Sequence, residues 1–287
     1  MPSTRFGHHG GSGFRYPEGL NLPGRLFVRN LIERRALLYQ MVRRDFEQRY
    51  VGSAAGWLWG IIHPLVMLLV WKFVFETCMK IQMPRGEVTQ NYTLFLLAGY
   101  LPWFLFQETV QRSANSLVEH SNLITKTVFP SEIVPIAIFF SSLVNHFFTI
   151  LLLVGATAWW MGHFSWMLVF LPLYTLLTGM LAIGIGWIAA SLQVYLRDTA
   201  QVTQVILTLW MWMTPVFLYE SYYPEKYQWI IDYNPLAYVV RNYRDRILSG
   251  ELPRVDELGV IAFYSVTAMV AGGLFFRQLK RGFADVL

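Results

Sequence analysis

We predict an all-α polytopic membrane protein from two features of the sequence. Of its 287 residues, 55% are hydrophobic and only 14% are charged, whereas an ordinary soluble domain has about 25% charged residues. Five stretches, about half of the chain, contain no Asp, Glu, Lys or Arg, and one helical crossing of a bilayer takes about 20 apolar residues. These stretches are residues 50–71, 88–107, 133–196, 199–219 and 258–276.

The first 55 residues divide into two parts. Residues 1–24 are rich in Gly, His and Pro without periodicity, which predicts a disordered cytoplasmic tail. Residues 25–55 are predicted to form an amphipathic interface helix, with arginines near anionic head groups. A membrane anchor and a docking surface for a cytoplasmic partner both explain this helix. Its apolar face carries Phe27, Val28, Leu31, Leu38, Val42 and Phe46, which recur at the helical period.

Residues 56–276 are predicted to form a domain of six transmembrane helices. The longest uncharged stretch exceeds one crossing, and a turn at residues 160–165 divides it into two helices. Prolines between the fifth and sixth crossings predict short broken helices there, and residues 277–287 are predicted to be a cytoplasmic tail. The crossings lie at about 56–76, 93–111, 134–160, 166–192, 201–219 and 258–276.

The distribution of Lys and Arg predicts the orientation of the chain. Six crossings put both termini on the same side of the membrane. If that side is the cytoplasm, the inner segments carry 15 basic residues and the outer segments carry 7. Cytoplasmic loops of membrane proteins are enriched in Lys and Arg, so we expect both termini in the cytoplasm.

The sequence offers no set of residues for catalysis. No stretch matches the phosphate-binding Gly-x-x-x-x-Gly-Lys-Ser/Thr loop, and the single cysteine, Cys78, excludes a cysteine metal site. His63 and His146 lie alone in apolar spans, where we expect them to hydrogen-bond neighbouring helices. Glu108 and Arg112 stand four residues apart, so we expect a local ion pair. We therefore predict no catalytic residue, no metal ligand, no cofactor on this chain and no nucleic-acid partner.

Aromatic residues are concentrated in the second predicted helix and in residues 210–243. An interfacial belt at head-group depth explains single members of these groups. Eleven aromatic residues in the second group exceed what anchoring requires, and flat rings with a polar edge suit a path for sugar rings. The candidates for this path and its outer gate are Tyr100, Trp103, Phe106, Trp210, Trp212, Phe217, Tyr219, Tyr222 and Tyr223.

Small residues at a spacing of four allow two helices to approach closely. Ala182, Gly186 and Ala190 follow this spacing in the fourth predicted helix, and Ala268 and Gly272 follow it in the sixth. The spacing is common, so it permits an oligomer without identifying one.

Several segments resemble, in order, the signature of ABC-2 type transport permeases, the membrane subunits of polysaccharide ABC exporters. The resemblance runs from residue 44 to residue 287 and is closer to O-antigen exporters than to teichoic acid or capsule exporters. The segments are Arg-Asp-Phe-Glu-Gln-Arg-Tyr at 44–50, Asn-Leu-Ile-Thr-Lys-Thr-Val-Phe-Pro at 122–130, Arg-Asp at 197–198, Trp-Met-Thr-Pro-Val-Phe at 212–217, Asn-Pro-Leu at 234–236, Tyr-Arg-Asp at 243–245 and Phe-Ala-Asp-Val-Leu at 283–287.

The resemblance implies a homodimer that pairs with two copies of a separate ABC ATPase, which binds ATP and Mg. The interface helix and the loop at 114–132 would receive the movement of the ATPase, and residues 220–257 would form an outer gate. The implied location is the bacterial inner membrane, with membrane lipids and a lipid-linked polysaccharide as further partners. The implied coupling residues are Arg44, Asp45, Arg49, Asn122 and Lys126, and a lipid diphosphate would meet Arg34, Arg35 and Arg44.

Three functional hypotheses follow. The leading one is a channel-forming permease that exports undecaprenyl-diphosphate-linked O-antigen polysaccharide, with teichoic acid or capsule polysaccharide as the alternative cargo. The second is a drug or lipid exporter of the ABC-2 superfamily, although such permeases usually lack the signature at 44–50. The third is a membrane-embedded glycosyltransferase or acyltransferase. It requires a catalytic cluster, whereas Asp232, Asp245 and Glu251 are scattered along the sequence.

Overall fold

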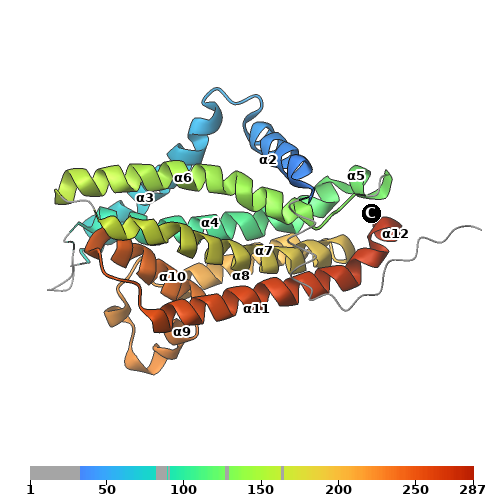
Figure 1. Ribbon diagram of the computed structural model, residues 1–287. Coiled ribbons are helices and arrows are strands. Elements are labelled where there is room, and N and C mark those ends of the chain that lie inside the picture. Colours follow the sequence, from blue (N-terminus) through green and yellow to red (C-terminus); the bar gives the residue numbers. More distant parts are fainter. Residues whose placement is uncertain (1–32, 82–88, 90, 127–128, 163–164) are drawn as a thin grey trace, which may run out of the picture.

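The computed structural model describes residues 33–81, 89, 91–126, 129–162 and 165–287, which form helices and connecting turns without a strand. The long helices lie side by side along one axis, so their ends define two ends of the molecule (Figure 1). The predicted all-α class is therefore confirmed for this part of the chain. The predicted disordered tail, residues 1–24, and the first residues of the predicted interface helix lie outside the described residues.

The helices follow the order of the predicted elements. The α-helices are α2 (Arg35–Tyr50), α3 (Trp59–Lys72), α4 (Tyr92–Glu119), α5 (Ser121–Lys126), α6 (Ile133–Met161), α7 (Leu171–Tyr195), α8 (Thr199–Met213), α9 (Trp229–Asp232), α10 (Pro235–Arg244), α11 (Val255–Leu279) and α12 (Phe283–Val286). Short helical turns extend or connect them: η1 (Gly56–Leu58), η2 (Phe73–Cys78), η3 (Trp166–Phe170), η4 (Glu220–Tyr222), η5 (Glu225–Tyr227), η6 (Asp245–Ser249) and η7 (Lys280–Gly282).

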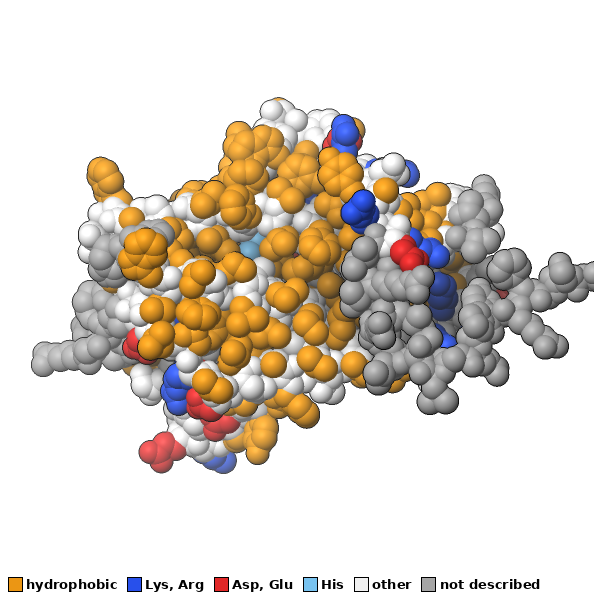
Figure 2. All heavy atoms as spheres, in the orientation of Figure 1, with side chains coloured by type: hydrophobic (Ala, Val, Ile, Leu, Met, Phe, Trp, Pro, Cys, Tyr) orange, Lys and Arg blue, Asp and Glu red, His pale blue; other side chains and the backbone are white. Residues whose placement is uncertain are grey.

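Four helical runs in the described ranges are long and apolar enough to cross a membrane: Gly56–Cys78, Ile133–Met161, Trp166–Tyr195 and Val255–Gly282. They coincide with four of the predicted crossings. The other two predicted crossings correspond to α4, whose last part is polar, and to α8, which has 15 residues. On the face that Figure 2 shows, hydrophobic side chains cover the middle of the helices, and charged side chains lie toward the ends.

Helix α2 is the described part of the predicted interface helix. It lies across the outside of the bundle and packs mainly against α6 (Figure 1). It ends at Tyr50 rather than at residue 55, because the chain turns at Gly52, whose φ of 78° is left-handed and favours glycine. Leu38, Val42 and Phe46 are half-buried, whereas Arg43, Arg44 and Glu47 are exposed.

Helix α4 is the central helix of the fold. It packs against α6, α7, α8 and α10, and most of its residues are buried. Asn91 caps its start, because the side-chain oxygen accepts hydrogen bonds from the backbone N–H groups of Thr93 and Leu94 at 3.0 and 3.3 Å. The helix continues to Glu119, beyond the predicted end at residue 111, because Ser113 and Ser116 are buried against the neighbouring helices.

The predicted turn between the third and fourth crossings is confirmed. Helix α6 ends at Met161, and the following Gly162 has a φ of 69°, a conformation that favours glycine after a helix. Ser165 precedes η3, and its hydroxyl accepts a hydrogen bond from the Met167 backbone N–H at 3.2 Å. Residues 163 and 164 lie outside the described ranges.

Helix α8 is shorter than predicted. It ends at Met213 rather than at residue 219, because Pro215 lacks an N–H donor and disfavours a helical conformation at Thr214. Between α8 and α11 the chain forms η4, η5, α9 and α10. The segment from η4 to α9 protrudes beside the bundle (Figure 1), whereas α10 packs against α4, α7 and α11. The predicted short broken helices between the last two long helices are therefore confirmed.

Helices α7 and α11 cross at almost backbone distance. A Cβ atom added to Gly184 would lie 2.3 Å from the carbonyl oxygen of Ala268, and one added to Gly272 would lie 2.1 Å from that of Gly184. Gly186 instead faces Ser113 of α4. The small residues of the sixth predicted helix, Ala268 and Gly272, therefore serve a contact within one chain.

The close contact between α7 and α11 predicts that adding one methyl group there destabilises the protein. Gly184→Ala and Gly272→Ala should each lower the unfolding free energy by about 2 kcal/mol, because backbone must move to relieve the overlap. Gly155→Ala is the matched control on α6, since its Cβ would meet no atom within 4 Å. Thermal unfolding in detergent measures the effect, and equal stability of the Gly184→Ala and Gly155→Ala variants would contradict the packing.

Candidate functional site

Two ion pairs connect α2 to α4 at the end of the molecule where α5 lies. Arg112 Nη2 lies 2.6 Å from Asp45 Oδ1, and Arg49 Nη1 lies 2.6 Å from Glu108 Oε1. All four side chains are less than a third exposed, and partial burial strengthens the attraction between opposite charges. We call these four residues the α2–α4 clamp.

The clamp overturns the prediction of a local ion pair between Glu108 and Arg112. Both residues pair with α2 instead, because Asp45 and Arg49 present the opposite charges at the same spacing of four residues. The two helices pair in opposite chain directions, so each carboxylate meets a guanidinium of the other helix. The spacing in α4 therefore serves a contact between helices.

Polar side chains of α6 continue the clamp. Arg49 Nη2 donates a hydrogen bond to Ser142 Oγ at 3.3 Å. Asn145 donates to the Tyr50 hydroxyl at 2.8 Å, and this hydroxyl lies 3.2 Å from Asn145 Oδ1. Gly60 of α3 passes beside the amide, where a Cβ would lie 2.5 Å from Asn145 Oδ1. The end of α2 is thus fixed to α4 and α6 by charge and hydrogen bonding together.

The predicted coupling residues gather at this end of the molecule but face different ways. Asp45 and Arg49 point toward α4, as members of the clamp. Arg44 and Asn122 are exposed, and Lys126 is the last residue of α5. The residues predicted to meet a lipid diphosphate, Arg34, Arg35 and Arg44, are all exposed. Arg34 and Arg35 lie at the start of α2, whereas Arg44 lines a small pocket together with Leu123 of α5 and Val134 of α6.

Most of the predicted channel aromatics are buried inside the single chain. Trp103 and Phe106 of α4 contact Trp210 of α8 edge-on, with ring centroids 6.5 and 5.2 Å apart. Tyr100 meets Trp71 of α3 at 4.6 Å. Beyond α8, Phe217 packs on Trp71 and Phe75, and Tyr219 stacks on Phe95 at 4.0 Å. These rings belong to one hydrophobic core that joins α3, α4 and the end of α8.

The other predicted channel aromatics reach the surface. Trp212 is 55% exposed and Tyr222 is 48% exposed, while Trp210 and Tyr223 are half-buried. Trp212 also touches Phe217, with centroids 5.0 Å apart. The structure therefore divides the predicted set into a buried core and a smaller group that another molecule could touch.

A polar stripe on α8 was missed by the sequence analysis. Gln201, Gln204 and Thr208 share one face of this otherwise apolar helix, and all three are exposed. Gln111 of the neighbouring α4 is half-buried and donates to the backbone oxygen of Ala200 at 3.3 Å. The signal in the sequence was the helical spacing of 201, 204 and 208 within an uncharged stretch. We call Gln201, Gln204 and Thr208 the amide stripe.

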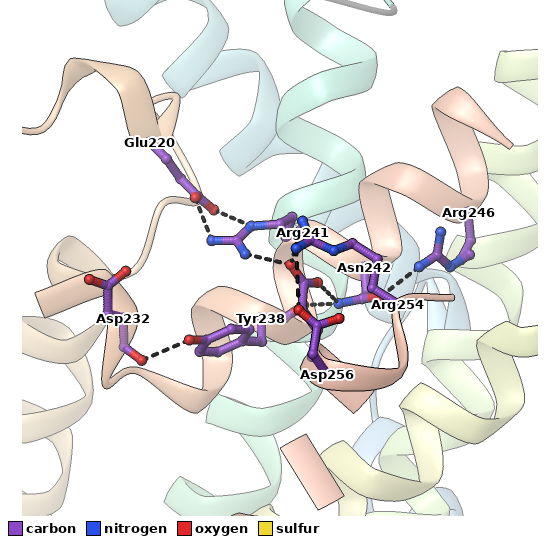
Figure 3. Close-up of polar contacts among 9 residues, drawn as sticks. Glu220, Asp232, Tyr238, Arg241, Asn242, Arg246, Arg254 and Asp256 are labelled. Atoms are coloured by element: carbon purple, nitrogen blue, oxygen red, sulfur yellow. Dashed lines mark hydrogen bonds and ion pairs between the residues drawn. The ribbon is translucent and has the colours of Figure 1, made fainter. Parts of the chain in front are cut away.

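Residues 220–257, the predicted outer gate, are called the outer segment. Polar and charged residues of this segment form a connected cluster around Arg241 (Figure 3). The guanidinium of Arg241 lies between Glu220 of η4, at 2.8 Å, and Glu257 of α11, at 2.7 Å. Glu257 also accepts from the Asn242 amide at 2.7 Å, and Asn242 Oδ1 accepts from Arg246 at 2.8 Å. Burial lowers the pKa of Arg241, but the bonds and charges of Glu220 and Glu257 outweigh it and raise the pKa. We call these five residues the outer charge cluster.

Asp245 lies beside this cluster and carries an unfavourable charge. Burial, and after it the negative charge of Glu251, raise its pKa from 3.8 to about 6. Between pH 3.8 and about pH 6 the Asp245 carboxyl keeps its proton in the folded state but loses it in the unfolded state. The free energy of unfolding should therefore fall as pH rises through this range. We expect Asp245→Asn to raise the thermal unfolding temperature at pH 7 but not at pH 3.5. An equal effect at both pH values would contradict the assignment.

Arg244 fixes the outer segment to α4 and to the end of α8. Its Nη1 and Nη2 atoms donate to the carbonyl oxygens of Pro215 and Val216, each at 2.7 Å, and Nε donates to that of Phe95 at 3.3 Å. The guanidinium also lies 3.6 Å from the centre of the Phe95 ring. Gly99 makes room for it, because a Cβ there would lie 2.3 Å from Arg244 Nη2. This side chain satisfies two carbonyl groups of the turn that follows α8 and binds a third in α4.

The neighbouring signature residues hold the same segment in place. The Tyr243 hydroxyl contacts Thr175 Oγ1 of α7 at 2.5 Å and His146 Nε2 of α6 at 3.1 Å, which confirms the helix-bonding role predicted for His146. Asn234 caps α10 by accepting from the Leu236 N–H at 3.1 Å, and it also accepts from Trp210 Nε1 at 2.9 Å. In the part of the chain that the structure describes, no group of three His, Cys, Asp or Glu side chains could hold a metal ion.

Comparison with known proteins shows what the chain is similar to. The profile of the ABC-2 type transporter family matches residues 36–248. The O-antigen export system permease protein RfbA of Klebsiella pneumoniae is 29% identical over 257 residues, which cover 88% of this chain and 95% of that protein. The protein of the same name from Myxococcus xanthus is 28% identical, with 90% and 98% coverage. The polysialic acid transport protein KpsM of Escherichia coli is 23% identical, with 82% and 90% coverage.

Proposed function

The chain belongs to the ABC-2 type transporter family, and we propose that it is the membrane permease subunit of a polysaccharide exporter whose cargo is lipid-linked O-antigen. The observation that carries this proposal is the match to O-antigen export permeases along nearly their whole length. Carriage on undecaprenyl diphosphate is the finer part of the proposal. Exposed Arg34, Arg35 and Arg44 on α2 supply the positive charge that a diphosphate would meet.

We propose six membrane crossings with both termini in the cytoplasm, in the bacterial inner membrane. Four runs are apolar enough to span by themselves. The polar residues of α4 are compatible with a fifth crossing because other helices surround it and separate it from lipid. Helix α8 is about 22 Å long at 1.5 Å per residue, and the uncharged residues 214–219 complete a sixth crossing. The excess of Lys and Arg in the inner segments supports this orientation.

The energy for export would come from two copies of a separate ATPase that binds ATP and Mg. Exposed Arg44 and Asn122 lie where such a partner would touch α2 and α5, near Lys126. Asp45 and Arg49 act differently, because both point toward α4 and would carry the movement of α2 into the bundle. The coupling proposal therefore separates contact residues from positioning residues.

The cargo path would lie between two copies of the chain. Helix α3, the adjoining η2 and helix α8 expose apolar residues such as Leu69, Phe73 and Leu209, and apolar surface of this kind requires lipid or a partner chain. The amide stripe and the exposed Trp212 and Tyr222 offer hydrogen bonds and flat rings, which suit hydroxyl-rich sugars. The buried aromatic residues Tyr100, Trp103 and Phe106 would lie in the core beneath this sugar-facing surface.

The amide stripe provides a test of the path. Replacing Gln201 and Gln204 together by leucine should reduce export about thirtyfold, because two hydrogen bonds contribute roughly 1 kcal/mol each and about 1.4 kcal/mol corresponds to a tenfold change in rate. Val202→Leu with Val205→Leu is the matched control, since these neighbours are exposed on the same helix but apolar. The measurement is polymer on the cell surface at equal chain levels. Unchanged export by the glutamine variant would remove the stripe from the path.

Deletion of the chain tests the function itself. In the source organism, the deletion should remove O-antigen from the cell surface and leave lipid-linked polymer inside, and a plasmid copy should restore export. Continued surface O-antigen would contradict the proposal.

Capsule polysaccharide is the second candidate cargo, favoured by the similarity to the polysialic acid transport protein. Loss of capsule with intact O-antigen would select it.

A further inference from the structure

The chain folds back on itself after α11. Phe283 is 1% exposed and packs edge-on against Phe276, with ring centroids 5.4 Å apart. Lys280 forms an ion pair with Glu132 at the start of α6, and the Tyr195 hydroxyl of α7 donates to the Leu279 carbonyl at 2.9 Å. Residues 277–287 were predicted to be a tail, but residues 277–279 belong to α11, and η7 and α12 follow. We call residues 280–287 the C-terminal hook.

The hook also contacts α5, one of the segments proposed to receive the movement of the ATPase. Among the described elements, α5 packs mainly on α12 and on the end of α4. Ile124 of α5 and Leu287 pack against the hydrophobic cluster that contains Phe283. Figure 1 shows α12 next to α5 at the same end of the bundle. A displacement of α5 therefore meets the hook directly.

The opposite end of α11 belongs to the outer charge cluster. Glu257, in its first turn, is 3% exposed and bonds both Arg241 and Asn242. Through Arg241 it is connected to Glu220, which follows the end of α8. Helix α11 contains no proline between its two anchored ends, and its close crossing with α7 at Gly272 offers a point about which it could tilt.

We propose that the C-terminal hook fixes α5 to α11, and that α11 transmits the displacement of α5 to the outer charge cluster. Lys280 and Phe283 are then positioning residues for transport. The inference rests on the proposed function, because it requires an ATPase that moves α5. Its physical basis is one continuous helix with polar anchors at both ends, which must move at both ends when it tilts.

The experiment alters the hook at one end of α11 and measures the accessibility of a residue beside the outer charge cluster at the other end. Cys78, the single cysteine, is replaced by serine, and the exposed Ser221 beside Glu220 is replaced by cysteine. A membrane-impermeant maleimide then labels intact cells that carry the chain with its ATPase, either active or catalytically inactive. We expect a severalfold difference in the labelling rate between the two ATPases. Lys280→Glu should abolish this difference, and combining it with Glu132→Lys should restore it.

Two further variants keep the test specific. Arg281→Glu makes the same charge change one residue away, at a side chain with no ion pair to a described residue, and should keep the difference. Phe283→Ala should lose it, because the cavity loosens the hook. The proposal is overturned if Lys280→Glu keeps the difference, if the charge swap fails to restore it, or if the parent chain shows none. If such a parent chain still exports polymer, the inference alone fails, whereas export without the chain would defeat the proposed function.

Discussion

Replacing Arg244 by methionine should cost about 3 kcal/mol of stability, because the carbonyls of Pro215, Val216 and Phe95 lose a charged donor in a partly buried site. Export should be lost with it, since the outer segment would no longer be fixed to α4. Thermal unfolding in detergent and surface polymer at equal chain levels measure the two effects.

The control variants of Arg244 distinguish the contribution of the planar guanidinium group from that of its positive charge. Arg244→Lys should recover only part of the stability, because an ammonium cannot reproduce the planar set of donors that reaches three carbonyls. Arg254→Met is the matched variant, since this arginine is 60% exposed and exposed ion pairs contribute little. If Arg244→Met were as stable as Arg254→Met, the anchoring role would be wrong.

Reversing one charge of the α2–α4 clamp should stop export while the chain still inserts into the membrane. Asp45→Arg sets two cations against each other at a site less than a third exposed, and breaking such a pair costs roughly 2–3 kcal/mol. Transport-linked ATP hydrolysis should fall with export, because α2 no longer moves with α4. Combining Asp45→Arg with Arg112→Asp restores opposite charges and should restore export.

The outer face of α2 provides a control on the same helix. Arg43 and Glu47 form an ion pair at 2.7 Å, but both side chains are more than half exposed, and pairs of this kind contribute about 0.3–0.5 kcal/mol. Glu47→Arg should therefore leave export unchanged. If Asp45→Arg fails only because the chain does not insert, or if the swap with Arg112→Asp does not recover export, the clamp does not couple the helices.

The long helices could be predicted from sequence because uncharged stretches and the turn at Gly162 mark them directly. The ends of α4 and α8 could not. Helix α4 continues through polar residues such as Ser113 because neighbouring helices bury them, and this burial depends on the whole fold. Helix α8 stops before Pro215, and the uncharged stretch that continues to residue 219 concealed this stop.

The sequence could predict which residues belong to the candidate site, but not which partner each side chain faces. The sequence reveals that Glu108 and Arg112 are spaced for an ion pair, but the partner depends on which helix packs against them. It likewise reveals an excess of aromatic rings, yet only packing shows that Trp103 is buried and Trp212 is exposed. The contacts of Tyr243 and Arg244 with α4, α6 and α7 explain why these two signature residues are needed to hold the outer segment in place.

Reconstituted transport tests the central claim most directly. The chain and its ATPase subunit are placed in proteoliposomes whose outer leaflet receives lipid-linked O-antigen, with the ATPase facing outward. We expect ATP to carry the polymer to the interior, where an added glycosidase cannot reach it, and we expect an inactive ATPase or the Asp45→Arg chain to leave it accessible. Polymer that stays accessible with the active, unaltered complex, or that becomes protected without this chain, would contradict the account.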